Sequence, residues 1–393
     1  MAQTGFCDSR PLLDLHKKAE EKRVHLRSWA NACPPKERRT QVEQFTSMGT
    51  FLNPEQDRVV GLHGLHIPPG DGFMDYSSLP IAPRSLDCGE QPLLWRISGL
   101  PHMLVPGLLR HEMELAMSRL GLIHDRTYAW DIFTNMMRSQ IQHPFPSAEL
   151  PGAYSEKMLA ILIDWLIQVH EGLHFSEDTL YLTVYLLNQA VRLLNVSISN
   201  LQLLGVVCLF LAGKKEECLL PEVSELCHLM ENTYTPYQLL RMERRVLCGL
   251  KFELSYTPPL HFLLLSTSIA RCSDQMVWMA RYLLELSLLK AQCVMYQPVH
   301  LAGAALQLAR CVLQEPPTPD GETAWCISSS IFVGSEATLL AIMRILAQAA
   351  ARAPIGNTRA SFLKFSTKDT MHVSKHTALM TAPCLLKVPG LPN

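Results

Sequence analysis

This chain of 393 residues lacks three features. It has no cysteines at the spacing of a metal site, no excess of charge of either sign, and no uninterrupted apolar run long enough to span a membrane. Its 12 cysteines include no CxxC pair, and the closest two, Cys218 and Cys227, are nine positions apart. Several cysteines lie inside apolar runs, where a free thiol behaves as a small hydrophobic side chain, so we expect a reducing compartment rather than a disulfide framework. The net charge of −1 argues against a general binder of nucleic acid, because such proteins are usually basic.

Signals for secretion and for catalysis are also missing. The first 23 residues contain no apolar core of a signal peptide, so we expect the protein in the cytoplasm, the nucleus or both. No phosphate-binding loop, nucleophile elbow or pair of catalytic carboxylates is found, and we therefore expect no enzymatic activity and no cofactor. The pair His63 and His66 has no cysteine or acid nearby and is more typical of a loop than of a metal site.

Glycine and proline are unevenly distributed along the chain. Residues 1–126 contain 11 Pro and 10 Gly, whereas residues 155–256 contain two Pro and four Gly. The first segment is therefore predicted to be mostly loop and of low order, with one amphipathic helix over residues 109–122. The second is predicted to be helical nearly throughout, because no alternating run typical of a strand competes with its helical pattern.

The run LQLLGVVCLFLAGKKEE, residues 201–217, is apolar almost without interruption as far as Gly213 and then carries four charges. Thirteen residues of helix rise about 20 Å, less than the roughly 30 Å that a membrane core requires. A helix that is apolar on all sides but too short to span a bilayer is typical of the centre of a soluble domain. We therefore expect this helix to be buried, with the four charges at the surface and no membrane partner.

Capping residues mark five helix starts between residues 151 and 256. Ser and Thr side chains cap helix N-termini, a Gln three residues later completes a capping box, and proline is favoured at the first helical position. The predicted starts, in chain order, are Ser155, Ser176, Ser199 with Gln202, Pro221 as an N1 residue, and Thr235 with Pro236 and Gln238. These residues predict an all-α domain with short connections.

A second helical set follows Thr257-Pro258-Pro259, with helices predicted over 261–270, 275–290, 299–313 and 335–350. The third of these has a centre of small residues at Gly303, which lies 98 positions after Gly205 in the first set. Two all-α units of similar length, each built around one buried helix, indicate a tandem repeat.

The run MLAILIDWLIQVHE, residues 158–171, resembles the signature of the first cyclin box, and the resemblance continues through residues 201–217 and TYTPYQLLRMERRVLCGLKFEL. YAWDIF, residues 128–133, is similar to the N-terminal helix that precedes the box in A- and B-type cyclins. KFSTKDTMHVSKH, residues 364–376, is similar to the tail of B-type cyclins. The chain is therefore identified as a divergent member of the cyclin family, related to the A and B types.

This resemblance implies an all-α fold of two tandem five-helix cyclin boxes, with an N-terminal helix and a low-order N-terminal extension. The predicted boundaries are 1–124 for the extension, 125–150 for the N-terminal helix and linker, 151–256 for the first box, 257–352 for the divergent second box and 353–393 for a C-terminal tail. It also implies a non-catalytic regulatory subunit that binds and activates a cyclin-dependent serine/threonine protein kinase, as a heterodimer, in control of the cell cycle.

The resemblance further implies which residues contact the kinase. In cyclins the basic residue at the end of the buried helix pairs with a glutamate two helices later, and here the matching residues are Lys214 and Glu243. Charge-assisted bonds of this kind fix the register of an interface. The alternative, from the residues alone, is that Lys214 only complements the helix dipole and Glu243 lies on a solvated face. Further kinase contacts are implied at Phe252, Leu254, Tyr128 and Ile132.

A docking patch for short Arg-x-Leu peptides of substrates and inhibitors is implied as well, and it consists of Met158, Ile161, Leu162, Trp165, Gln168, Leu201, Gln202 and Glu231. The first four recur at helical spacing, which is otherwise the ordinary signature of a core stripe. A different stripe, formed by Leu159, Ile163 and Leu166, is available to face inward, which favours the docking interpretation. Gln168 stands where A-type cyclins have an acid, so we expect weaker or altered docking.

Two departures from the family pattern bear on function. A buried Arg–Asp pair that is usual in cyclin boxes is replaced by Leu159 and Asn188, and loss of both charges together leaves neither stranded. Lys215 replaces a usual phenylalanine next to the kinase, which puts the identity and affinity of the partner in question. A degenerate cyclin that acts only as a scaffold is therefore an alternative. A transcription-related double cyclin fold is another, although the missing zinc ribbon and the net charge argue against it.

One candidate degradation signal lies in the N-terminal extension. RPLL, from Arg10 to Leu13, fits the minimal R-x-x-L pattern of mitotic cyclins, although a pattern with two fixed residues is common by chance.

Overall fold

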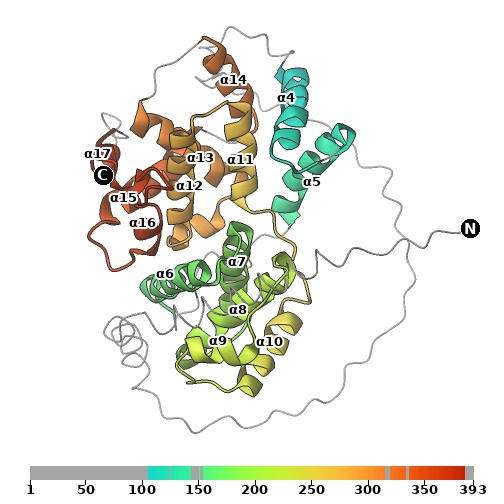
Figure 1. Ribbon diagram of the computed structural model, residues 1–393, viewed down its shortest axis with the longest axis vertical. Helices are drawn as coiled ribbons and strands as arrows, with labels where there is room; N and C mark the ends of the chain where they lie inside the picture. The colour runs from blue at the N-terminus through green and yellow to red at the C-terminus, as the bar shows by residue number, and fades with distance from the viewer. Residues whose placement is uncertain are drawn as a thin grey trace, which may run out of the picture.

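The computed structural model describes residues 105–123, 125–142, 150, 154–314, 319–332 and 336–385. Within these residues all regular secondary structure is helical, and the helices form two units, with two further helices along one side (Figure 1). The predicted all-α fold of two tandem five-helix units is confirmed.

The first unit consists of α6 (Glu156–Leu173), α7 (Glu177–Leu193), α8 (Leu201–Glu216), α9 (Val223–Leu229) and α10 (Pro236–Gly249). Helix α8 is its central element and packs against α6, α7 and α10. Apart from the partly exposed Gln202, α8 is buried as far as Gly213, and exposure begins with Lys214. A Cβ atom on Gly205 would lie 3.1 Å from Leu162 Cδ1, so the glycine lets α6 and α8 approach closely.

Three of the five predicted helix starts are confirmed in position. The side chain of Ser155 accepts a hydrogen bond from the backbone N–H of Met158, and Thr235 with Gln238 forms a reciprocal capping box. Ser176 is also an N-cap residue, but its hydroxyl does not cap the helix. Instead Glu217, just beyond α8, accepts hydrogen bonds of 2.6 Å from the Ser176 N–H and from the Thr179 hydroxyl. The last acid of the KKEE cluster therefore supports the start of α7.

The other two predicted starts are wrong. Ser199 lies inside a short 3₁₀ turn, η2 (Ile198–Asn200), where its hydroxyl contacts Ser197 Oγ at 2.9 Å, and Asn200 takes the N-cap position without a side-chain bond. Helix α9 begins two residues after Pro221, because Glu222 and Glu225 form a capping box there. In both places the N-cap is a polar residue next to the one that was predicted, Asn200 for α8 and Glu222 for α9.

The second unit consists of α11 (Pro259–Ile269), α12 (Asp274–Ser287), α13 (Pro298–Leu313), α14 (Pro319–Ser329) and α15 (Glu336–Arg352), with a 3₁₀ turn, η3 (Ala291–Met295), before α13. The four predicted helices are confirmed, and α14 was not predicted. Helix α13 packs against α11, α12 and α15, as α8 packs against its own neighbours. A Cβ atom on Gly303 would lie 2.7 Å from the ring of Phe332, so this glycine too marks a close contact of a central helix.

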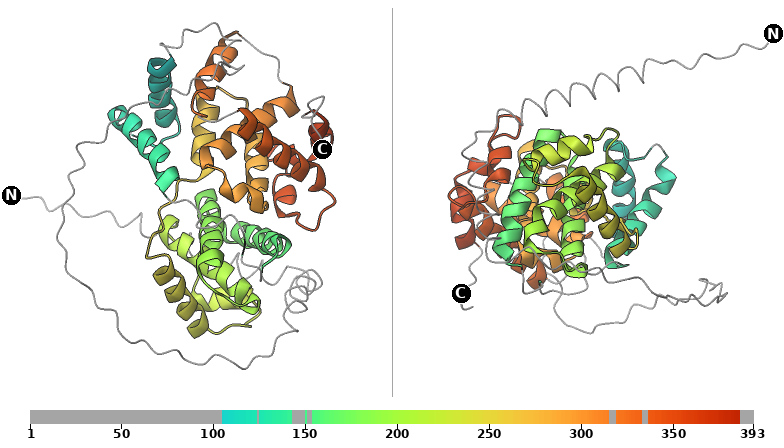
Figure 2. Two further views of the ribbon diagram at one scale, coloured as in Figure 1. Left: turned by 180° about the vertical axis from the view of Figure 1, so that it is seen from behind. Right: turned by 90° about the horizontal axis from the view of Figure 1, so that it is seen from below.

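The N-terminal helices α4 (Val105–Arg119) and α5 (Ala129–Gln142) run along the side of the molecule, as the view from behind also shows (Figure 2). Helix α4 packs against α11 and α14 of the second unit, with Met113, Ala116 and Met117 buried. It confirms the amphipathic helix predicted over residues 109–122, and it begins four residues earlier. Helix α5 reaches the connection between the units, where the hydroxyls of Ser139 and Thr257 are 2.6 Å apart.

The C-terminal segment forms α16 (Ala360–Lys364), a 3₁₀ turn, η4 (Val373–Lys375), and α17 (Ala378–Leu385). Helix α17 packs against α13 and α15, and η4 packs against α12, so this segment is part of the second unit. Helix α16 contacts both α12 and α6. The predicted tail therefore bridges the two units.

Within the described residues, one stretch, Ile198–Glu216, is long and apolar enough to cross a membrane by length and composition, and 67% of it is buried inside the protein. The central helix of a packed domain shows the same combination.

Candidate functional site

Lys214 and Glu243 come together at the end of the central helix. Lys214 lies in the last turn of α8 and Glu243 in α10, and their Nζ and Oε1 atoms are 2.5 Å apart. The Lys214 Nζ atom also lies 4.3 Å from the centre of the Phe210 ring. The glutamate side chain is 11% exposed and the lysine side chain 44%, so the ammonium group keeps N–H groups that point to solvent. The predicted partners therefore form an ion pair, and Glu243 is not on a solvated face as the alternative required.

The other residues that the resemblance assigned to the kinase are mostly exposed apolar side chains. Phe252 is 69% exposed, Tyr128 61% and Ile132 40%, whereas Leu254 is partly buried against the core. Lys251 and Phe252 both have positive φ angles, of 52° and 59°, directly after α10. Non-glycine residues rarely adopt this conformation, which costs roughly 1–2 kcal/mol per residue. Phe252 is thus an exposed aromatic residue in a strained backbone segment, and it makes no contribution to the core.

These exposed residues come from three segments of the chain. Tyr128 ends η1 (Arg126–Tyr128), Ile132 lies in the first turn of α5, and Phe252 follows α10. Helices α5 and α10 lie on the same side of the molecule in Figure 1 and in the view from below in Figure 2. We call Lys214, Glu243, Phe252, Tyr128 and Ile132 the Lys214 surface. Lys215, beside it, is 38% exposed and pairs with Glu216 at 3.0 Å, so it takes no part in the core.

The predicted docking patch is not a single exposed surface. Leu162 and Leu201 are fully buried and Met158 nearly so, and the contact of Leu162 with Gly205 shows that it packs onto α8. These three side chains therefore belong to the core of the first unit, and the docking role of the patch stays a prediction that depends on its other members. Leu159, Ile163 and Leu166 are buried as predicted.

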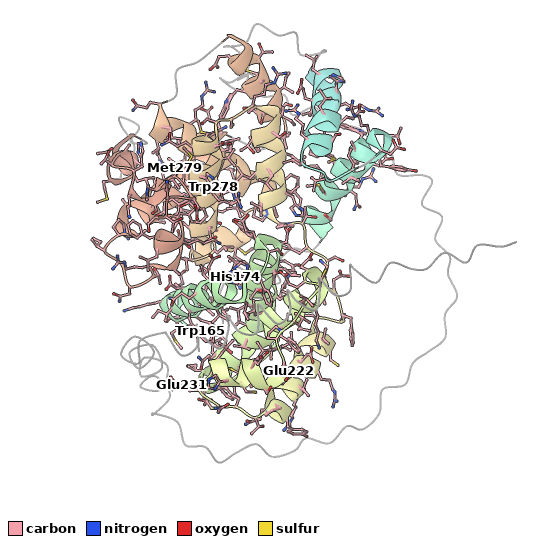
Figure 3. The ribbon with its side chains drawn as sticks, viewed as in Figure 1. Trp165, His174, Glu222, Glu231, Trp278 and Met279 are labelled. Carbon is pink, nitrogen blue, oxygen red and sulfur yellow. The ribbon has the colours of Figure 1, made fainter. Side chains whose placement is uncertain are left out.

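The remaining docking candidates are accessible. Ile161, Trp165, Gln168 and Gln202 are partly exposed, and Glu231 is exposed in a left-handed turn after α9 with a φ of 54°. Trp165 and Glu231 lie on the same side of the first unit in the view of Figure 3. The Gln168 side-chain amide donates a hydrogen bond to Asp164 at 3.3 Å. Its carbonyl oxygen stays free to accept, but it carries no charge for a basic peptide residue.

Where cyclins usually have a buried Arg–Asp pair, this chain has a buried leucine and a hydrogen-bonded asparagine. Leu159 is buried in the core, and the amide nitrogen of Asn188 donates to the Val184 carbonyl at 3.0 Å. Arg192, one turn further along α7, donates to the Asn188 side-chain oxygen at 3.1 Å. Burial lowers the pKa of this arginine. The expectation that loss of both charges together is tolerated is consistent with this geometry.

A buried polar cluster that the sequence analysis missed joins the two units. Lys364 on α16 lies 2.9 Å from Glu171 on α6 and 2.8 Å from Glu285 on α12. Nearby, Asp164 accepts a hydrogen bond of 2.8 Å from the Ala360 backbone N–H. The signal in the sequence was present, since LIDWL and LLELS each place one acid inside an apolar run. An acid at such a position needs a buried partner.

The environment of the cluster moves its pKa values apart. Burial raises the pKa of Asp164 to about 6, helped by the negative charge of Glu285. Burial alone would also raise the pKa of Glu171, but hydrogen bonds and charge from His170 and Lys364 hold it near 2. Burial opposes the charged form of Lys364, yet the two glutamates hold its pKa above the usual range. The lysine therefore stays charged and serves as the positive centre of the cluster.

No group of three or more potential metal-binding side chains occurs among the described residues. His63, His66 and the Arg10–Leu13 motif lie outside the described residues. Among the described cysteines, Cys208, Cys227, Cys293 and Cys326 are buried in the core.

Comparison with known families agrees with this architecture. The cyclin N-terminal domain matches residues 131–255, and the cyclin C-terminal domain matches residues 257–379. The chain belongs to the cyclin family. The match to the second domain extends past Arg352 into the segment that bridges the two units.

Mitotic cyclins are among the proteins that are similar to this chain. The G2/mitotic-specific cyclin-B2 of Rana japonica is 32% identical over 258 residues, which are 65% of this chain and 64% of the relative. The cyclin-B2 of Oryzias javanicus is 31% identical over 270 residues, covering 68% and 69%. The chain thus spans just under two thirds of the length of the first of these relatives. A viral cyclin from herpesvirus saimiri, known from its X-ray structure, is similar over 55% of this chain and 97% of its own, with 16% identity and a TM-score of 0.45.

Proposed function

We propose that this cyclin is a non-catalytic regulatory subunit that binds and activates a cyclin-dependent serine/threonine protein kinase in the cell cycle. The observation that carries the proposal is the Lys214–Glu243 ion pair, which is preformed where the buried helix α8 reaches the surface. Phe252, Tyr128 and Ile132 are exposed in addition, and exposed aromatic and apolar side chains together with a fixed charge pair are typical of an interface. An isolated chain gains nothing by leaving these rings in water.

The charge pair can fix the register of such an interface. Glu243 holds the Lys214 ammonium group in one position, so the remaining N–H groups aim at a defined point outside the chain. A kinase loop with backbone carbonyls at that point would accept charge-assisted hydrogen bonds. Apolar contacts of Phe252, Tyr128 and Ile132 with the same partner would exclude water and strengthen those bonds.

A narrower substrate-docking role is supported by Ile161, Trp165, Gln168, Gln202 and Glu231. Their side chains are at least partly exposed, and Glu231 provides one negative charge for a basic peptide residue. With Leu162 and Leu201 committed to the core, the apolar part of the site is shallow. We therefore propose weak docking of R-x-L peptides. We propose a nuclear, cytoplasmic or shared localisation, as the sequence predicted.

A scaffold without kinase activation is the second candidate. Lys215 favours it, because a charged and exposed side chain stands where the family pattern has a phenylalanine beside the kinase. Burying an unpaired lysine in an interface would oppose association. Its ion pair with Glu216 lessens that penalty, so we prefer the activating role.

Reconstitution tests the proposed function. The tagged chain is expressed in dividing cells, a co-purifying cyclin-dependent kinase is identified by mass spectrometry, and both proteins are then purified separately. We expect phosphate transfer to a histone substrate only when kinase and cyclin are combined, and none from the cyclin alone. Binding without any rise in kinase activity would support the scaffold instead, and activity of the chain alone would contradict a non-catalytic role.

A further inference from the structure

A concave site lies between the two units, away from the Lys214–Glu243 pair. It is a cavity of about 420 Å³ formed by the first turn of α6, the connection from α12 into η3, and the last turns of α15. The polar side chains that line it are Glu156, Lys157, Lys290, Gln292, Gln348 and Arg352.

This cavity is remote from the Lys214 surface. It is built on the start of α6, whereas α8 ends beside the other end of α6, where a Cβ atom on Gly213 would lie 3.5 Å from the Phe175 ring. The 18 residues of α6 rise roughly 27 Å between these two ends. A short peptide in the cavity would therefore not contact the Lys214–Glu243 pair.

The charge in the cavity is unbalanced. Lys157, Lys290 and Arg352 bring three positive charges to it, and Glu156 brings one negative charge. Within the described part of the chain, none of the three cations has a carboxylate within the 4.0 Å of an ion pair, and none makes a side-chain hydrogen bond. A net charge of +2 thus remains available in a concave site, where like charges reinforce their attraction for an anion.

The size and the neutral lining narrow the class of anion. One water molecule has a share of roughly 30 Å³ of liquid volume, so the cavity is on the order of fourteen times larger, far more than a single phosphate or carboxylate needs. A stretch of two or three amino acids fills it better. The amides of Gln292 and Gln348 can both donate and accept, which suits the N–H and C=O groups of a peptide backbone. Phosphate oxygens would use only the donors.

We propose that this cavity binds an acidic segment of a partner polypeptide, one that carries two neighbouring carboxylates. Lys290 and Arg352 bind the carboxylates, and the arginine can hold one of them through two parallel N–H bonds. Lys157 adds long-range attraction, and Glu156 opposes it. This site is independent of the proposed kinase partner, because it uses no residue of the Lys214 surface.

The test uses the full chain and a fluorescein-labelled peptide with the sequence Gly-Asp-Glu-Asp-Glu-Gly, measured by fluorescence polarisation at low salt. We expect the double variant Lys290→Glu/Arg352→Glu to bind about tenfold more weakly or worse. The matched control is Lys368→Glu/Lys375→Glu, which makes the same change in net charge at two exposed lysines of the C-terminal segment. It should change the affinity by less than about twofold. Glu156→Gln should strengthen binding.

Three results would overturn the proposal. The first is equal binding of the peptide in which Asn and Gln replace the acids, and the second is equal weakening by the control variant. The third is displacement of the peptide by millimolar inorganic phosphate together with tighter binding of a phosphoserine peptide, which would assign the cavity to phosphate. The milder variant Lys290→Gln/Arg352→Gln replaces the double glutamate variant if thermal melting shows that the latter is unfolded. Kinase binding should be unchanged in all of these variants, so failure here is distinct from failure of the proposed function.

Discussion

Asp164 is an acid in the middle of the apolar run LIDWL, and its two oxygens hold two different parts of the molecule. One accepts the backbone N–H of Ala360 from the C-terminal segment, and the other accepts the Gln168 amide from the proposed docking side of α6. A buried carboxylate with neutral donors and the negative Glu285 nearby is poorly stabilised when ionised. This one residue thus makes the junction of the units sensitive to protons.

The pH dependence has a definite sign. The pKa of Asp164 is raised from 3.8 in the unfolded chain to about 6 in the folded protein, so the folded state binds more protons between these values. The contribution of Asp164 to stability is therefore largest below pH 4 and falls as pH rises through 6. Asp164→Asn removes this dependence. Relative to the wild type, the variant should gain about 1 kcal/mol of unfolding free energy between pH 5 and pH 7.5.

Urea denaturation of both proteins at the two pH values measures this difference, and groups other than Asp164 cancel in the comparison. A constant difference between variant and wild type across the range would show that Asp164 keeps an ordinary pKa.

Helix α6 buries a wide apolar face. Leu159, Leu162, Ile163 and Leu166 form one buried stripe, and both Leu162 and Leu166 pack onto Gly205 of α8. Only a narrow strip that includes Ile161 and Trp165 reaches solvent. A helix of this kind carries apolar residues around most of its circumference, so hydrophobic spacing alone does not tell which stripe is exposed.

The two positions should respond differently to truncation. Leu162→Ala opens a cavity against α8 and should lower the unfolding free energy by about 2–5 kcal/mol. Trp165→Ala should lower it by less, because the ring is partly in water, but it should weaken binding of R-x-L peptides. Chemical denaturation and peptide titration of the two variants separate these effects. If Trp165→Ala is the more destabilising change and leaves peptide binding intact, then α6 has no docking role.

Local patterns predicted most elements but not all of their ends. The capping residues Ser155 and Thr235 were sufficient because each acts within its own helix. The helix start predicted at Ser199 is wrong because Ser199 itself lies in a 3₁₀ turn, and α14 was missed because the proline and glycine in its first turn resemble a loop. The Lys214–Glu243 contact was expected only from the family resemblance, since the two residues are 29 positions apart.

Asp164 and Ala360 are 196 positions apart, so no local sequence pattern predicts their contact. In the same way, the three cations of the cavity between the units come from distant segments, on α6, after α12 and on α15, and only folding brings them together.

At the scale of the whole molecule, the C-terminal segment and ion pairs clamp the two units. Arg281 on α12 pairs with Glu177 on α7, and His261 on α11 lies 2.7 Å from Asp178. Lys364 is the most buried link, since Glu285 is 1% exposed. The packing of the two units therefore includes a buried positive charge of the C-terminal segment that pairs with one acid from each unit.

Removing the charge of Lys364 should lower the free energy of unfolding, unless the charge of Glu285 is removed with it. Lys364→Met leaves Glu285 buried without its cation and should lower the unfolding free energy by about 3–5 kcal/mol. The double variant Lys364→Met/Glu285→Gln removes both charges and should recover most of the loss. Thermal and urea unfolding of wild type, both single variants and the double variant form a complete cycle. Additive losses would show that the two side chains do not interact.

The central claim is that the Lys214 surface exists for a kinase, and the affinity of Lys214→Ala for the reconstituted kinase tests it most directly. The change should lower the unfolding free energy by only about 1 kcal/mol, because the lysine is largely at the surface. Kinase affinity should fall by a factor of roughly 30 or more, which corresponds to about 2 kcal/mol or more for a buried interfacial charge. Lys368→Ala, an exposed lysine elsewhere, should leave both quantities unchanged. Wild-type kinase affinity of Lys214→Ala at equal stability would contradict the account and leave this chain a cyclin in fold alone.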